Sequence, residues 1–385
     1  MNHNLKILLL SISIVLLIIG CTKQEKVERI VEDGVEIIVN HLEPYKIRGE
    51  PTTLHLEEEF SIDTESDAVA ETGLTVIHNF DIDSEGSLYF LNRRSGEDFI
   101  FKFNHKGNFV TSFGRKGQGP GELMRPIFLR VDYKDDIVIT DIVGKIVSFG
   151  KDGSYKKQVK TEQILAQALP LDNGNYLAKK RIFNPDGNYV EWPLLLCGPE
   201  LEVIKELGRY KQPNYRDKWG FPEDNFVSCV SEGKIFMGNS ESGYEIRVYD
   251  LAGNLKRKIR KEFRPVEVTE ELKKKTMEEL EGSNVAFMTD GIFFHKHCPA
   301  FQYFFTDDKG HVFVMTYEES ENPREYVYDV FNGPGIFISR IYLDNMVRRG
   351  SIGRKFATAK NRRLYCLKEK ENGQLELVVY RMIWE

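Results

Sequence analysis

The sequence predicts an all-β fold built from repeated units, and three observations carry this prediction. Aromatic residues make up 12% of the chain, and such residues favour strands. Short apolar segments recur along the chain, separated by turn sequences such as DSEG, NHKG, KDG and LDNG, in which glycine reaches positive φ at little steric cost. The units repeat at roughly 35 to 50 residues, which is the usual period of a propeller blade. We therefore expect a six-bladed β-propeller.

The first five units each contain about four strand-like segments, which we assign in chain order as the inner, second, third and outer strands of a blade. The last unit has only three. The segment TTLHLEEEF, residues 52–60, lies upstream of the first unit, and we expect it to supply the missing outer strand and close the ring. A β-sandwich is the structural alternative. The six units span residues 80–114, 128–159, 167–207, 226–259, 301–343 and 356–383.

The N-terminus reads as a targeting segment. Lys6 precedes an apolar run over residues 7–20, which is short for a membrane span but typical of a signal-peptide core. The run ends in LIIGC, which resembles the bacterial lipobox; the resemblance implies cleavage before Cys21 and lipidation of that residue. An ordinary signal peptide or a short membrane anchor is the alternative.

The domain organisation follows from these segments. We expect a lipoprotein signal peptide over residues 1–20, a lipid-anchored tether over 21–48 and the propeller over 49–385. The tether is polar, except that VEIIVN within it suits a short strand. Thr22 follows the predicted lipidation site and matches no inner-membrane retention signal, so we expect the outer membrane and leave its face open.

A helical insertion is predicted at about residues 264–299. The sequence TEELKKKTMEELEG has the composition of an exposed helix. Thr269 suits the N-cap, Glu270 and Glu271 fall in the first turn, and Gly282 marks the stop.

The glycine-rich stretch FGRKGQGPGELMRP, followed by VDYKDDIVITD and IVSFGKDGSYKK, resembles an NHL repeat, except at IFLR (Ile127 to Arg130). With the lipobox and six degenerate blades, the chain closely resembles the six-bladed propeller lipoproteins of Bacteroidetes. The resemblance implies the fold over nearly the whole mature chain and leaves activity open. We expect the stretch to link two blades, with Gly117, Gly119 and Gly121 at positive φ.

Several classes of function are disfavoured by composition and motifs. The net charge of -6 argues against a general nucleic-acid binder. The sequence contains no GxSxG, no HExxH and no Walker lysine after its glycine run, and HKHC (295–298) is too small a set for a zinc site. Cys197, Cys229 and Cys366 lie in apolar, strand-like segments and are expected to be buried free thiols. We expect no cofactor, no metal and a monomer.

The strand order of a propeller places the blade-linking segments and the second-to-third hairpins on one face, which we call the top face. The segments expected on this face are rich in arginine, including Arg93 and Arg125. The arginine guanidinium group suits carboxylate, sulfate or phosphate groups. We expect a non-catalytic binding module on the cell envelope, for an anionic or glycan-like ligand, a peptide or an envelope protein partner. The candidate ligand-binding residues are Arg94, Arg115, Lys116, Gln118, Tyr215, Arg216, Trp219, Arg324 and Arg349.

Three alternatives stay open at this point. The top-face side chains are a solvated rim in the simplest reading. A hydrolase or lyase with its site at the top of the central channel is the second, although the tops of the inner strands offer few acid-base or metal-binding residues. A structural partner within a membrane uptake complex is the third.

Overall fold

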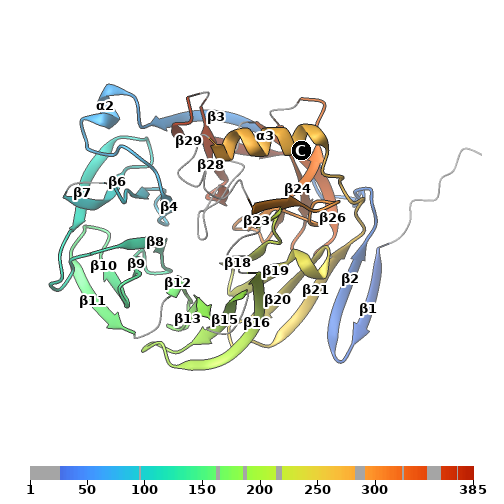
Figure 1. Ribbon diagram of the computed structural model, residues 1–385, viewed down its shortest axis with the longest axis horizontal. Helices are drawn as coiled ribbons and strands as arrows, with labels where there is room; N and C mark the ends of the chain where they lie inside the picture. Colours follow the sequence, from blue (N-terminus) through green and yellow to red (C-terminus); the bar gives the residue numbers. More distant parts are fainter. Residues whose placement is uncertain are drawn as a thin grey trace, which may run out of the picture.

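The structure of the protein is a computed structural model. It describes residues 27–94, 97–161, 165–184, 189–213, 219–281, 291–322, 325–344, 357–370 and 372–385, without the side chains of Pro213, Trp219, Glu279 and Asp344. Six antiparallel sheets surround a central axis as the blades of a propeller (Figure 1). This confirms the predicted fold class. No helix within the described ranges is long and apolar enough to cross a membrane.

Each of the first three blades follows the chain from the inner to the outer strand. Turns between the strands use glycine at positive φ, for example Gly86 and Gly107 in blade 1, because no Cβ opposes that conformation. Blade 1 is β4 (Asn79–Ile82), β5 (Leu88–Leu91), β6 (Asp98–Phe103) and β7 (Phe109–Arg115); blade 2 is β8 (Pro126–Val131), β9 (Ile137–Asp141), β10 (Lys145–Phe149) and β11 (Tyr155–Lys160); blade 3 is β12 (Leu165–Pro170), β13 (Tyr176–Lys180), β15 (Tyr189–Cys197) and β16 (Val203–Pro213), with β14 (Ile182–Phe183) beside β15.

The remaining blades repeat this order, and the last one is completed from the N-terminal region. Blade 4 is β18 (Phe226–Ser231), β19 (Lys234–Asn239), β20 (Glu245–Asp250) and β21 (Leu255–Lys261); blade 5 is β23 (Tyr303–Thr306), β24 (Val312–Glu319), β25 (Glu325–Phe331) and β26 (Phe337–Asp344); blade 6 is β27 (Ala357–Lys360), β28 (Arg363–Glu369), β29 (Leu375–Trp384) and β3 (Leu54–Asp63).

The ring closes as predicted. β3 pairs antiparallel with β29 over almost its whole length, from Leu54 opposite Trp384 to Asp63 opposite Glu376. Ile62 of β3 is buried among residues of blades 1, 5 and 6. Blade 6 is therefore completed by an outer strand from the other end of the chain, which ties the ring shut.

The predicted tether is partly wrong. Residues 28–40 form a hairpin of β1 (Glu28–Glu32) and β2 (Val35–Asn40), and β2 adds in parallel to the outer strand β21 of blade 4 (Figure 1, blue hairpin). Ile37 and Ile38 are fully buried there. This burial of apolar surface stabilises the docked hairpin, so the segment is not a free tether. Cys21 and the predicted signal peptide lie outside the described residues.

The helical insertion is confirmed as α3 (Glu270–Glu281). Thr269 acts as the predicted N-cap, because its Oγ1 accepts a hydrogen bond from the Leu272 amide at 3.2 Å. A short parallel pair, β17 (Trp219–Phe221) with β22 (Ile292–Phe294), connects the insertion to the segment before blade 4. The other short elements are α2 (Asp67–Ala70) and the 3-10 turn η1 (Ser240–Ser242).

The glycine-rich stretch links blade 1 to blade 2 as predicted, but its glycines act differently from the prediction. Gly114 and Gly121 have φ of 77° and 76°, whereas Gly117 and Gly119 lie outside the left-handed region. A Cβ on Gly117 would meet the carboxylate of Glu122, which folds back over the loop and accepts a hydrogen bond from the Gly119 amide at 2.8 Å. At these two positions glycine leaves room for the folded-back Glu122 side chain, and neither residue has a left-handed φ.

Candidate functional site

The predicted assignment of loops to one face is confirmed where blade 1 meets blade 2. The amide of Lys116, in the segment between blades, donates to the carbonyl of Glu97, in the hairpin between β5 and β6, at 3.2 Å. Thr161 and Gly144 make the equivalent contact in blade 2 at 2.8 Å. The helix α3 lies on this same top face, toward the viewer in Figure 1.

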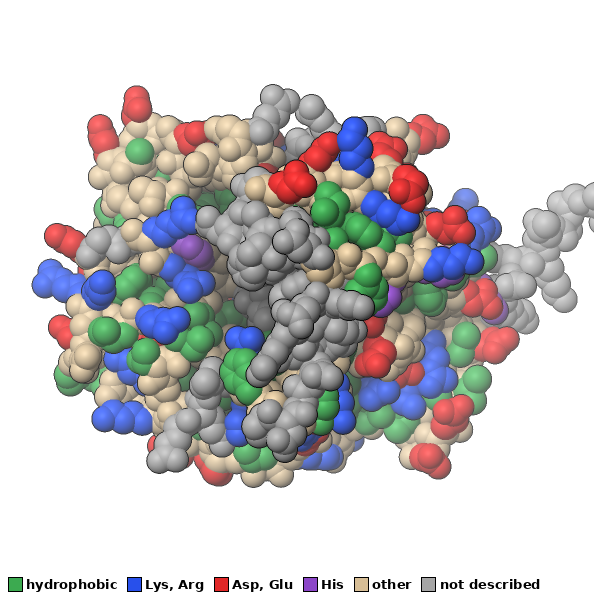
Figure 2. All heavy atoms as spheres, viewed as in Figure 1, with side chains coloured by type: hydrophobic (Ala, Val, Ile, Leu, Met, Phe, Trp, Pro, Cys, Tyr) green, Lys and Arg blue, Asp and Glu red, His purple; other side chains and the backbone are tan. Residues whose placement is uncertain are grey.

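Five exposed cationic side chains lie on two adjacent top-face loops, and we call them the basic patch. Figure 2 shows Lys and Arg side chains grouped on this side of the face, over blades 1 and 2. The pKa of Arg93 is lowered, first by partial burial of its guanidinium group and second by the neighbouring charge of Arg125. The basic patch consists of Arg93, Arg94, Arg115, Lys116 and Arg125.

Two carboxylates beside the basic patch, Glu122 and Asp141, are committed to the backbone, whereas Glu97 in the hairpin of Arg93 is exposed. The Asp141 carboxylate accepts hydrogen bonds from the amides of Met124 at 2.7 Å and Arg125 at 3.0 Å. Glu122 accepts from the amide of Gly119, as described above. Each carboxylate thus stabilises the loop that carries the cations, which holds those cations in position without pairing with them.

The hairpin that carries Arg93 and Arg94 is fixed in a similar way. The Arg93 amide donates to Nδ1 of His78 at 3.1 Å, and the Arg94 amide donates to Oδ1 of Asn92 at 3.0 Å. Asn92 is itself buried and donates to the Gly73 carbonyl at 3.1 Å. The backbone under the two arginines is therefore anchored, while their side chains extend into solvent.

Most cations of the basic patch lack an acidic partner. Arg115 lies 4.0 Å from Asp98, but its side chain is 85% exposed, so this pair contributes little. The other four members form no ion pair within the described part of the chain. A cluster of uncompensated cations on a rigid surface favours an anion and disfavours a cationic partner.

The structure brings together Arg94, Arg115, Lys116 and Gln118 from the predicted set; all four are exposed, Arg94 on the hairpin between β5 and β6, Arg115 at the end of β7 and the others on the segment that links blade 1 to blade 2. Arg93 and Arg125, which both lie in segments predicted for the top face, complete the basic patch. The predictions for Tyr215, Arg216, Arg324 and Arg349 lie outside the described residues, and Trp219 is described only through its backbone in β17. The predicted aromatic platform on the long loop after blade 3 therefore stays a prediction.

The other side of the top face carries the opposite charge. A cavity of about 480 Å³ lies between α3 and blade 5. Figure 2 shows Asp and Glu side chains around this helix. Carboxylates outnumber cations in the lining, which includes Glu267, Glu271, Glu319, Glu321 and Lys275. Among the residues that the structure describes, the top face thus carries a basic patch on blades 1 and 2 and an acidic cavity beside α3.

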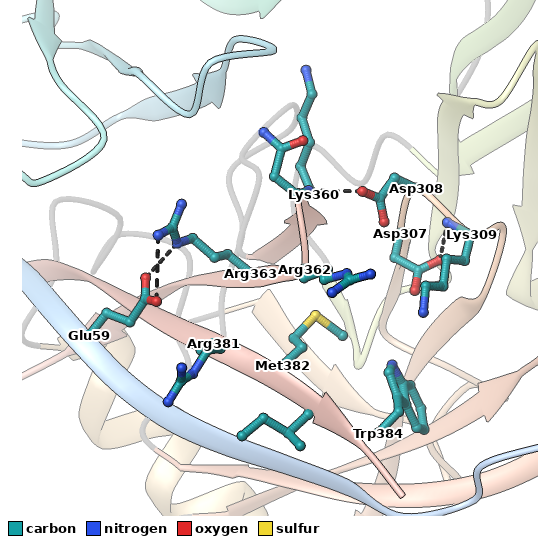
Figure 3. Close-up of a pocket in the computed structure, with 12 residues that line it drawn as sticks. Glu59, Asp307, Asp308, Lys309, Lys360, Arg362, Arg363, Arg381, Met382 and Trp384 are labelled. Carbon is teal, nitrogen blue, oxygen red and sulfur yellow. Dashed lines mark hydrogen bonds and ion pairs between the residues drawn. The ribbon is translucent and has the colours of Figure 1, made fainter.

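Sequence reasoning missed a second cavity, on the opposite face, which we call the bottom pocket (Figure 3). It measures about 590 Å³ and is lined by Glu59, Asp307, Asp308, Lys309, Lys360, Asn361, Arg362, Arg363, Arg381, Met382, Ile383 and Trp384. These residues come from blades 5 and 6 and include Glu59, which is far from the others in the chain. The one local signal was the run NRR in the two-residue turn between β27 and β28, which contains no glycine.

The cysteines and histidines do not assemble into a metal centre in the part that the structure describes. No group of three or more His, Cys, Asp or Glu side chains there is placed to hold an ion. The His295 ring packs against Phe293, and Cys298 is buried. Cys197 and Cys366 are buried free thiols as predicted, whereas Cys229 is half-buried; burial raises the pKa of Cys366 to about 12, so its thiol stays protonated.

At the channel, polar side chains of the innermost strand serve structure. Asn79 Oδ1 accepts from the Leu129 amide at 3.1 Å, and Asp81 Oδ2 accepts from the Val131 amide at 2.9 Å. These contacts pin blade 2 to blade 1. The carboxylate that a channel-centred acid-base site would need from blade 1 is thus engaged in holding the next blade.

Comparison with known proteins supports the fold and is silent on activity. A family model described as 6-bladed beta-propeller matches residues 72–213. The chain is similar to the crystal structure of a candidate exported protein from Bacteroides fragilis, with 13% identity and a TM-score of 0.52 over 90% of this chain and 99% of that one. It is also similar to a member of the DUF4221 family from Bacteroides vulgatus, with 11% identity and a TM-score of 0.52 over 87% and 100% of the two chains. No curated protein matches it.

Proposed function

We propose that this protein is a non-catalytic binding module of the cell envelope that recognises an anionic glycan through the basic patch on blades 1 and 2. The observation that carries the proposal is the set of four cations, Arg93, Arg94, Lys116 and Arg125, that have no acidic partner among the described residues. Extended polyanions suit such a surface, because several of their charges can be met at once by spaced cations.

The location in the envelope is part of the proposal. The lipobox-like LIIGC supports lipidation of Cys21, and the similarity to a candidate exported protein of Bacteroides fragilis supports a position outside the cytoplasm. Acyl chains on Cys21 would hold the propeller at a membrane surface, which we propose to be the outer membrane.

Binding to acidic polysaccharides tests the proposal. Polygalacturonate and heparin supply carboxylate and sulfate groups, and neutral dextran is the reference. The double variant Arg93→Ala/Arg125→Ala removes two patch cations, and we expect it to weaken binding roughly 30-fold, because each exposed charge contact contributes about 1 kcal/mol. The affinity of the unmodified protein should fall as salt is raised from 50 to 200 mM, since exposed charges are screened.

The matched control is Lys106→Ala/Lys157→Ala, which removes the same charge from exposed positions in the opposite-face turn of blade 1 and on the outer strand of blade 2. Equal losses in the two double variants would show that only net charge matters and would contradict a specific patch. Absence of binding to both polyanions by the unmodified protein would also contradict the proposal.

A further inference from the structure

The bottom pocket has the size of a small-ligand site. Its volume of about 590 Å³ lies within the usual range for such sites, roughly 300–1,000 Å³. Four pieces of the fold line it: β3 through Glu59, the turn between β23 and β24, the turn between β27 and β28, and the C-terminal end of β29. It lies on the face opposite to the basic patch, so any ligand here is independent of the proposed function above.

The carboxylates around the bottom pocket are already satisfied. Asp307 accepts from the Lys309 amide at 2.9 Å, the His311 amide at 2.8 Å and the His311 ring at 2.7 Å. Asp308 accepts from the Asn361 amide at 2.9 Å, and Glu59 is paired with Arg363. The acids therefore shape the walls of the pocket and hold the two turns together.

The cations are only partly committed. Lys360 donates to the Ile82 carbonyl at 3.0 Å, and Arg381 is paired with Glu57. The side chains of Lys309 and Arg362 are exposed and have no ion pair among the described residues. Figure 3 shows the Arg362 guanidinium extending above Met382 toward the turn that carries Asp307 and Lys309. The pocket thus has two spare positive charges at one end.

The backbone of Arg362 gives an independent reason to expect a role for its side chain. Asn361 and Arg362 are the two central residues of a hairpin turn, and both have positive φ, 53° and 58°. Glycine is favoured at the second of these positions, because a Cβ is strained there. Two other hairpins of this chain with the same pattern, Asp33-Gly34 and Glu232-Gly233, do use glycine. Arg362 therefore occupies a position that turn geometry alone would give to glycine.

The floor of the pocket is apolar and held in place. Met382, Ile383 and Trp384 follow one another at the end of β29. The Trp384 ring packs on the His311 ring with centroids 5.1 Å apart, and His311 is in turn bonded to Asp307. An aromatic surface below a pair of cations suits a ligand with a flat apolar face and an acidic group on its edge.

We propose that the bottom pocket binds an acidic saccharide unit, with its carboxylate on Arg362 and Lys309 and the apolar face of its ring on Trp384 and Met382. A pyranose acid meets both requirements: the C–H face of the ring is apolar, and the carboxylate projects from its edge. The volume admits one or two such rings.

Titration calorimetry with digalacturonate, against lactose as the neutral reference, tests the proposal. Arg362→Gly is the decisive variant, because it removes the cation while relieving the strained turn. We expect its affinity for digalacturonate to fall at least tenfold while its melting temperature stays the same or rises. Arg362→Lys should retain part of the affinity, and Lys106→Ala, which removes a cation from another turn of this face, should retain all of it.

Three results would overturn the proposal. The first is unchanged binding in Arg362→Gly, and the second is no binding of digalacturonate by the unmodified protein. The third is that Arg93→Ala/Arg125→Ala loses digalacturonate binding while Arg362→Gly retains it, which would place the ligand on the basic patch. Failure of the basic patch proposal alone would leave the Arg362 result intact, so the two sites are tested separately.

Discussion

Replacing Asn40 tests whether the N-terminal hairpin is part of the folded propeller. Asn40 is fully buried and joins three segments: its Nδ2 donates to the carbonyls of Arg260 at 3.1 Å and Gly335 at 3.0 Å, and its Oδ1 accepts from the Phe337 amide at 2.8 Å. It therefore links β2 to blades 4 and 5. Asn40→Ala removes all three hydrogen bonds and leaves their backbone partners buried.

The size of the effect follows from those three hydrogen bonds. Each contributes about 1 kcal/mol, so the hairpin should lose roughly 3 kcal/mol of its docking free energy. At about 1.4 kcal/mol per factor of ten, the fraction of molecules with the hairpin detached rises roughly 100-fold. Ile37 and Ile38 still contribute their apolar burial, so the rest of the propeller should stay folded.

Hydrogen exchange measures this directly. Amides of residues 28–40 should exchange roughly 100-fold faster in Asn40→Ala, whereas those of blades 1 and 2 should not change. Asn173→Ala is the matched control, since Asn173 is exposed and its side chain makes two hydrogen bonds far from the hairpin, donating to the Leu251 carbonyl at 3.3 Å and accepting from the Asn175 amide at 3.1 Å. If exchange over residues 28–40 is unaffected by Asn40→Ala, the three-way link does not hold the hairpin and our reasoning is wrong.

Two further substitutions probe buried charges. Asp329 lies 3.3 Å from the buried Lys261 and also pairs with Arg340 at 2.9 Å, so Asp329→Ala leaves Lys261 buried without its carboxylate and should cost about 3–5 kcal/mol. With an unfolding entropy of about 2.1 cal/mol/K per residue, differential scanning calorimetry should show a melting temperature roughly 5 °C lower, and an unchanged value would contradict a desolvated charge cluster. Burial lowers the pKa of Lys179 from 10.5 to about 8, so the folded state binds fewer protons than the unfolded state between these values and stability rises with pH across that window. Lys179→Met should therefore melt a few degrees higher than the unmodified protein at pH 7 and lose most of that advantage by pH 10; a gain independent of pH would refute the assignment.

The blades themselves were predictable because their determinants are local. Alternation of apolar residues, glycine-containing turns and a period of roughly 35 to 50 residues all act within one unit. The cap at Thr269 is equally local, and it was predicted correctly. Closure by residues 52–60 followed from counting: a last blade short of one strand needs a partner, and one strand-like segment was left over.

The glycine-rich stretch shows where local reasoning ends. Its position between two blades was predicted, but the reason for Gly117 and Gly119 was not, because it depends on the Glu122 side chain folding back over them. Likewise, the docking of residues 28–40 depends on Asn40 meeting Gly335, which is 295 residues away in the sequence. The polar, charged composition of this segment predicts a tether, because the residues against which it packs lie far away in the sequence.

The sequence by itself determined the six-bladed architecture, the closing strand, the helix and the presence of many top-face arginines. The tertiary structure decided which of those arginines have no carboxylate partner among the described residues, since Glu122 and Asp141 accept hydrogen bonds from the loop backbone. It also decided that Arg362, Lys309 and Trp384 share one pocket. The physical reason is the same in both cases: repeat and turn signals act within a few residues, whereas charge balance and cavities arise where segments distant in the chain meet.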